Sequence, residues 1–186
     1  MRPAVAIFAV AVLAQWLVPL VGVWQHERVI ARGVAVRIPC AAPDPYDPLR
    51  GRYLAVRPAE TGAPAPDGMP DRAAVPVWAT LAVGDDGLAR IDSLALERVS
   101  GPTVIRLVAR PSGTSNGVRT VILEWPLDRF YLNERLAADA DTLLAERLAA
   151  GKLPVAEIRL LDGRAVLTDL LLDGTPVREL VRRRRE

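Results

Sequence analysis

An uncharged apolar stretch near the start of the chain, AVAIFAVAVLAQWLVPLVGVW from Ala4 to Trp24, sets the first limit on its possible structure. As an α-helix it would extend roughly 30 Å, the thickness of the hydrocarbon core of a bilayer. Its interruptions, Gln15, Pro19 and Gly22, are compatible with a membrane helix. Trp24 suits the membrane interface. The stretch predicts a single transmembrane helix that binds the protein to a lipid bilayer.

A cleaved signal peptide and a buried core helix are the alternatives for this stretch. A signal peptide has a shorter apolar region, of roughly 7–15 residues, and a small-residue cleavage site. Residues 20–25, LVGVWQ, offer no such site, so we favour an uncleaved anchor. A lipoprotein anchor fits less well, because the only cysteine, Cys40, lies far beyond the apolar stretch. We expect an anchor over residues 1–28, one domain over 29–180 and a basic tail over 181–186.

The charged residues near the stretch leave the side of the membrane open. Arg28, Arg32 and Arg37 follow the stretch and Arg2 precedes it, which, counted literally, slightly favours a cytoplasmic domain. A single cysteine suits either compartment. The net charge is +2, so nucleic acid is not an expected partner.

Strand patterns separated by turn residues fill most of the remaining chain. Three hairpins are expected: 75–83 with 88–96 around Gly84-Asp85-Asp86-Gly87, 103–109 with 118–125 around a loop at 111–117, and 155–160 with 164–171 around Asp162-Gly163. Shorter strands are expected at 33–38 and 51–56, with a proline-rich turn at 43–48 and a flexible surface loop at 58–74. The pattern predicts a mainly β domain, an antiparallel sandwich or a barrel-like sheet.

One amphipathic helix is expected between the second and third hairpins, from Glu134 to Ala150. Asn133 is a candidate N-cap, Gly151 a candidate C′ residue, and Pro154 prevents continuation. The apolar residues recur at helical spacing: Leu136, Ala140, Leu143, Leu144 and Leu148. We expect this stripe to cover a face or mouth of the sheet.

Residues 45–53, PYDPLRGRY, resemble the signature of the GDYXXLXY family, uncharacterised membrane-anchored bacterial proteins named for that motif. Three later segments are similar too: 127–134 (LDRFYLNE), 162–167 (DGRAVL) and 170–177 (LLLDGTPV). The resemblance implies an extracytoplasmic domain, on the periplasmic or extracellular side of the inner (cytoplasmic) membrane, and a multi-pass membrane protein as a neighbour. It implies no known activity, and no cofactor is expected.

The chain departs from the family motif at three positions. Arg52 stands where the family has aspartate, Val56 where it has leucine and Pro58 where it has the second tyrosine. If that aspartate were catalytic or metal-binding in the family, Arg52 would have removed the function.

The motif has a structural and a functional interpretation. As structure it is a rigid corner, in which aspartates accept hydrogen bonds from backbone amides and prolines set the bend. As a functional site it is a polar cluster that grips an anionic group or a partner's backbone. The candidate residues are Asp44, Asp47, Arg50, Gly51, Arg52 and Tyr53.

The inventory of reactive groups is short, so no catalytic residue is assigned. His26 is the only histidine and lies beside the apolar stretch, so a Ser-His-Asp or Cys-His site lacks its base. Metal sites of histidine and cysteine are excluded by count. A Ser-Lys dyad using Lys152, the only lysine, has no recognisable nucleophile. A carboxylate pair, Glu124 with Asp128 or Glu134, is the remaining enzymatic possibility.

The chain closes on Arg182, Arg183, Arg184 and Arg185. They form either a solvated, disordered tail or a contact with anionic lipid head groups. From the sequence we expect a membrane-anchored, non-enzymatic interaction or accessory module. The alternative is a small-ligand-binding β domain or a carboxylate-based enzyme.

Overall fold

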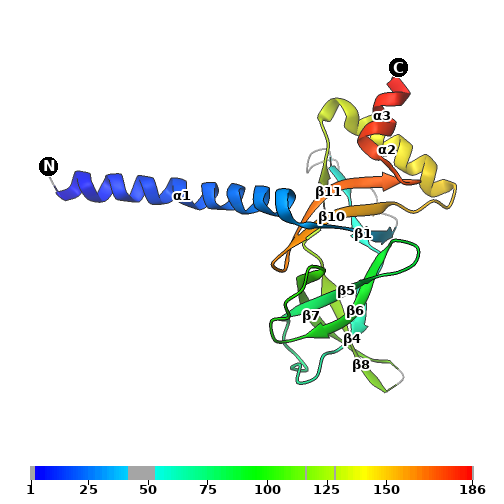
Figure 1. Cartoon of the computed structure of the whole chain (residues 1–186), viewed down its shortest axis with the longest axis horizontal. Coiled ribbons are helices and arrows are strands. Elements are labelled where there is room, and N and C mark those ends of the chain that lie inside the picture. Colours follow the sequence, from blue (N-terminus) through cyan, green and yellow to red (C-terminus); the bar gives the residue numbers. More distant parts are fainter. Residues whose placement is uncertain (1–2, 42–52, 116, 128, 186) are drawn as a thin grey trace.

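The structure, a computed structural model, describes residues 3–41, 53–115, 117–127 and 129–185. A long helix, α1 (Pro3–Arg32), projects from a body of antiparallel sheets and two further helices (Figure 1). The helix ends at Gly33, whose N–H donates to the carbonyl of Val29 at 2.8 Å. Val29 is buried, whereas the earlier apolar side chains described on α1 are almost all exposed. Only the last turns of α1 therefore pack on the body.

The first sheet has the strand order β12-β11-β10-β1-β3 and is joined to α1 through β1. Its strands are β1 (Val34–Ala41), β3 (Arg57–Pro58), β10 (Val155–Leu161), β11 (Arg164–Leu172) and β12 (Thr175–Pro176). Alternate residues of β1, namely Val36, Ile38 and Cys40, face the core, as the predicted period of two requires. The turn between β10 and β11 is at Asp162 (φ 53°) and Gly163 (φ 79°), as predicted.

The second sheet has the order β4-β8-β7-β5-β6 and curves until it is nearly closed. Its strands are β4 (Gly62–Pro64), β5 (Val75–Val83), β6 (Ala89–Ala95), β7 (Val104–Ser115) and β8 (Val118–Glu124). The two edge strands are linked by Glu60, whose carboxylate accepts the N–H of Ile91 at 2.7 Å. The backbone carbonyl of Glu60 accepts from the Trp125 indole at 2.9 Å. Glu60 thus links the segment before β4 to β6 and to the residue after β8.

The predicted aspartate loop between β5 and β6 is a hairpin loop. Asp86 accepts the N–H of Leu88 at 3.0 Å and two bonds from the Arg90 guanidinium, at 2.6 and 3.2 Å. The Arg90 guanidinium lowers the pKa of Asp86 to about 2. The prediction that these aspartates serve the turn is confirmed at Asp86.

Two loop predictions are wrong. Residues 111–115 do not form a loop but continue β7, with a bulge between Pro111 and Gly113, so the turn is confined to the residues before β8. The segment 58–74 is not simply a flexible surface loop, because it contains β4, which pairs with β8, and Met69, which is 4 % exposed. The proline and glycine content of both segments suggested loops. Their strand pairing depends on β8, which the local sequence does not indicate.

The two sheets meet where the β10–β11 turn lies against β7 and β5. Arg106 N–H donates to the Gly163 carbonyl at 2.9 Å, and Ile105 bridges to Gly163. Gly163 lies under the half-buried ring of Trp78, with no room for a side chain. Buried residues of both sheets belong to one continuous core. The domain is mainly β and antiparallel, as predicted.

Two helices cover the end of the first sheet (Figure 1). Helix α2 (Glu134–Ala149) matches the prediction, and Gly151 (φ 74°) ends it, with Lys152 N–H donating to the Arg147 carbonyl at 2.9 Å. Ala140, Leu143 and Leu144 are buried in the shared core, so the apolar stripe packs within the domain, against α3 and the short strand β2 (Tyr53–Ala55).

The disordered-tail alternative for the chain end is wrong, because the tail belongs to a second helix, α3 (Val177–Arg185). Val177 and Val181 are fully buried, and Arg184 makes a bidentate ion pair with Glu146 of α2. The run of arginines suggested a solvated tail, although Val177 and Val181 are spaced as on one face of a helix.

Considering only the residues that the structure describes, no helix reaches the combination of length and apolar character that a membrane crossing needs.

Candidate functional site

The motif residues Asp44, Asp47, Arg50, Gly51 and Arg52 lie outside the described residues. Tyr53 begins a short strand, β2 (Tyr53–Ala55), which pairs with β9 (Arg129–Tyr131) in a two-stranded ribbon. Whether the motif forms a rigid corner or a polar cluster stays a prediction. The structure does show where the chain continues after the motif: β2 pairs with β9.

Three of the four segments that carry the family resemblance meet at this ribbon. Tyr53, at the end of the first segment, is opposite Tyr131 of the second. The third participant is the segment 170–177, since β11 contacts β9 and Arg178, just after it, lies over the Phe130 ring at 4.9 Å. Phe130 is 2 % exposed. The resemblance therefore follows one packed region, in which β2 also contacts α2.

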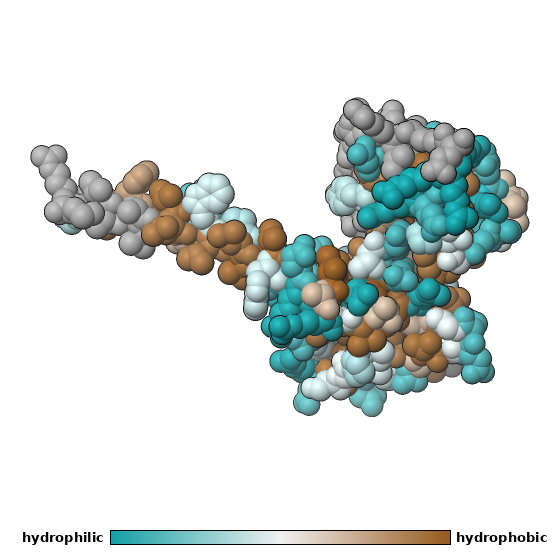
Figure 2. Space-filling model, turned by 45° about the horizontal axis from the view of Figure 1, so that its top comes forward, coloured by the Kyte–Doolittle hydropathy of each residue, from teal (hydrophilic) through white to brown (hydrophobic). Residues whose placement is uncertain are grey.

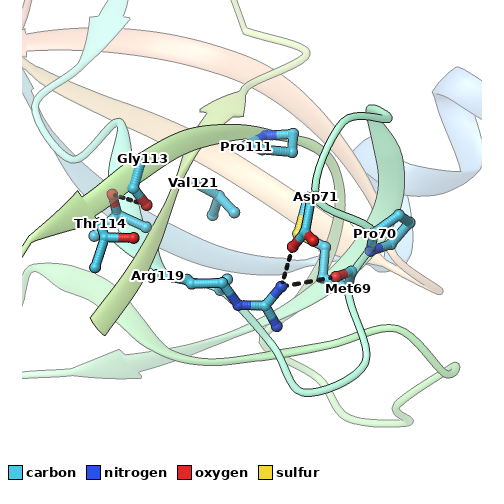
Figure 3. Close-up of a pocket in the computed structure, with 10 residues that line it drawn as sticks. Met69, Pro70, Asp71, Pro111, Gly113, Thr114, Arg119 and Val121 are labelled. Atoms are coloured by element: carbon cyan, nitrogen blue, oxygen red, sulfur yellow. Dashed lines mark hydrogen bonds and ion pairs between the residues drawn. The ribbon is translucent and has the colours of Figure 1, made fainter. Parts of the chain in front are cut away.

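A separate hollow of about 240 Å³ lies between residues 65–71 and the β7–β8 hairpin (Figure 3). Arg119 of β8 spans it, donating to the Asp71 carboxylate at 2.6 Å and to the Met69 carbonyl at 3.1 Å. The guanidinium holds the ordered loop to the hairpin. Arg119 and Asp71 form an ion pair with each other, so neither charge is left unpaired for a ligand in this hollow.

A second hollow, of about 300 Å³, lies at the base of α1. Gln25, His26 and Val29 of the helix line it together with Arg106 of β7 and Arg164 of β11. The structure thus brings the only histidine beside two arginines that are far away in sequence. Sequence analysis missed this site, because Arg106 and Arg164 read as ordinary outward residues of alternating strands.

Cys40 is a buried thiol, 1 % exposed, as a plain structural cysteine would be. Burial raises its pKa to about 11, partly opposed by a hydrogen bond that the sulfur accepts from the backbone of Ala156. A thiol with so high a pKa carries almost no thiolate near neutral pH. Cys40 belongs to the core of β1 and β10.

Of the carboxylates named as a possible catalytic pair, Glu124 alone has a described side chain, so the pairing stays a prediction. Glu124 forms an ion pair with Arg110 on the outer face of the second sheet. Asp128 and the side chain of Glu134 lie outside the described part. Across that part, no group of three or more histidine, cysteine, aspartate or glutamate side chains could hold a metal ion.

The C-terminal arginines lie on α3, away from the free end of α1 (Figure 1). Arg183 pairs with Glu179 one turn earlier, and Arg184 with Glu146. Contact of Arg182 to Arg185 with lipid stays a prediction.

These features define an antiparallel β protein with two five-stranded sheets, a long N-terminal helix and a two-stranded ribbon of β2 and β9. The chain belongs to the GDYXXLXY family, since the model of that family, described as GDYXXLXY protein, matches residues 15–170. No curated protein and no solved structure matches the chain.

Proposed function

We propose that the protein is a single-pass membrane-anchored envelope protein whose β domain is a non-enzymatic interaction module, accessory to a multi-pass membrane protein. The anchor is α1, which would cross the inner membrane with Ala4 to Trp24. The domain would face the periplasm or the outside of the cell. This sidedness rests on what the family resemblance implies, because the local arginine counts do not decide it.

The observation that carries the proposal is the exposure of apolar side chains along α1 (Figure 2). The exposed fractions run from 44 % at Val21 to 76 % at Val18. Soluble monomers rarely expose contiguous apolar surface of this extent. A hydrocarbon environment accounts for it directly.

The apolar side chains surround α1 instead of following one stripe. Neighbouring residues are exposed together: Ile7 and Phe8, then Trp16, Leu17 and Val18, then Val23 and Trp24. A helix that lies flat on a membrane, or against one partner helix, needs a polar face as well. A helix apolar on all sides fits a membrane span.

The alternative is a small-ligand-binding domain, and the hollow in Figure 3 is one candidate place for such a ligand. Its volume of about 240 Å³ is below the range of roughly 300–1,000 Å³ usual for small-molecule sites. Its arginine and aspartate already bind each other. This hollow therefore gives no support to the ligand-binding alternative.

Cross-linking in native membranes tests the module. We expect the full chain to capture a multi-pass membrane protein, and the double variant Arg50→Ala, Arg52→Ala to lose that capture. The matched control, Arg72→Ala with Arg90→Ala, removes the same charge from the second sheet region and should still capture it. Failure of the wild-type chain to capture any membrane protein would overturn the module, and unchanged capture by the motif variant would remove the motif from the interface.

A further inference from the structure

The hollow at the base of α1 combines basic walls with an apolar floor. Its charged side chains are Arg106 and Arg164, both exposed, and His26 lies on the same rim. Val29 and Val166, both buried, supply the floor, with Pro126 beside them. None of the residues that line the hollow is acidic.

These two arginines have no acidic partner among the described residues, whereas several other arginines do. Arg28, on the same part of α1, is paired with Asp162 at 3.5 Å, and this takes up the carboxylate nearest to Arg164 in sequence. Within the described part of the chain, neither Arg106 nor Arg164 makes a side-chain ion pair or hydrogen bond. Two guanidinium groups at one hollow without a counter-charge favour an anion, and phosphate suits their forked donors.

The position of the hollow along α1 selects the source of that anion. Val29 follows Trp24 by five residues, which is a rise of about 8 Å along a helix. The head-group layer on each side of a bilayer is roughly 5–8 Å thick. With Trp24 at the interface, the hollow therefore lies at the depth of lipid phosphates. The guanidinium carbon of Arg28 lies 5.7 Å from the centre of the Trp24 ring, so an aromatic and a basic group are in contact at this depth.

We infer that this hollow binds the phosphate of an anionic phospholipid, with Arg106 and Arg164 contacting the phosphate and the apolar floor contacting the adjoining glycerol and acyl carbons. The inference rests on the proposed function, since it places α1 in the bilayer. A bound lipid would fix the domain against the membrane surface and so set the direction in which its second sheet points.

The test measures binding to the full chain in a neutral detergent. The probes are dihexanoyl phosphatidylglycerol, dihexanoyl phosphatidylcholine and inorganic phosphate, each titrated by calorimetry. We expect phosphatidylglycerol to bind most tightly, and Arg106→Gln with Arg164→Gln to weaken it roughly 10- to 100-fold. Arg106→Lys with Arg164→Lys should weaken it less, since charge is kept and the fork is lost. The control Arg72→Gln with Arg90→Gln should bind as the wild type does.

Three results would overturn the inference: unchanged binding by the glutamine pair, equal weakening by the control pair, or inorganic phosphate binding as tightly as phosphatidylglycerol. The circular dichroism spectrum of the double glutamine variant must match that of the wild type. If the spectra differ, the binding of the double lysine variant is used for the comparison instead. Alkaline extraction of membranes separates this inference from the proposed function. If the wild-type chain stays in the membrane while the pocket variants bind normally, only the lipid site fails.

Discussion

Gly163 joins the two sheets at a point where no other residue fits. A Cβ atom there would lie 2.2 Å from the Trp78 ring, and the backbone has φ 79°. Gly174 has nearly the same φ, 77°, but nothing within 4 Å of a Cβ atom. We expect Gly174→Ala to lower the free energy of unfolding by about 1 kcal/mol, from backbone strain alone. Gly163→Ala should cost a further ~1–3 kcal/mol from the clash.

Chemical denaturation of the two full-length variants measures this difference. Equal losses in Gly163→Ala and Gly174→Ala would mean that the Trp78 ring moves aside without cost, and the account of the sheet junction would be wrong.

Cys40 makes stability depend on alkaline pH. Because burial raises its pKa to about 11 in the folded chain, the unfolded chain loses this proton first. The contribution is fully present below the unfolded pKa of about 8.5 and is lost as the pH rises to 11. Over that window the free energy of unfolding should fall by up to about 1.4 kcal/mol per pH unit more than in Cys40→Ala. Parallel pH curves for the two proteins would contradict the burial of a protonated thiol.

At the scale of elements, the second sheet is kept nearly closed by Glu60. Glu60→Ala removes the acceptor of the Ile91 N–H and should lower the free energy of unfolding by about 1–3 kcal/mol. Hydrogen exchange at Ile91 should become faster while exchange in the middle of β7 changes little. Glu97→Ala, at an exposed position after β6, is the control and should leave both unchanged. Unaltered exchange at Ile91 in Glu60→Ala would mean that β6 does not depend on this bond.

The α2–α3 pair changes how lipid contact by the C-terminal arginines should be tested. Truncation after Leu180 would remove Val181, which is fully buried, and so would damage the core as well as the charge. Arg182→Gln with Arg183→Gln leaves Val181 and the Arg184–Glu146 pair in place. We expect weaker binding of this variant to anionic liposomes if the arginines touch lipid, and binding equal to that of the wild type would exclude the contact.

The sequence predicts those elements that are determined by residues close together in the chain. The hairpin turn at Asp162-Gly163, the aspartate loop at Asp86 and the helix end at Gly151 are set by neighbours in the chain, and all three are confirmed. β4 and the end of β7 depend on pairing with β8, so proline and glycine content was misleading there. The hollow at the base of α1 is lined by four segments that are distant in the sequence, so no local pattern predicts it. The motif from Asp44 to Arg52 lies outside the described residues.

Helix α1 determines how the whole molecule would sit in a membrane. Its apolar surface is exposed on all sides and its last turns are fixed to the body, which is the arrangement expected of a tether. A reporter fused after Glu186 tests the side of the membrane: activity of a periplasm-specific reporter supports the envelope location. Activity of a cytoplasm-specific reporter would reverse the location and leave the tether in place.

The tether itself is tested most directly by washing membranes that contain the full chain with alkaline carbonate. Integral proteins stay in the pellet, whereas proteins held by charge or by other proteins are released. We expect the wild-type chain in the pellet, and Leu17→Arg with Val18→Arg, which places two charges in the middle of the apolar stretch, largely in the supernatant. Release of the wild-type chain into the supernatant would contradict the account.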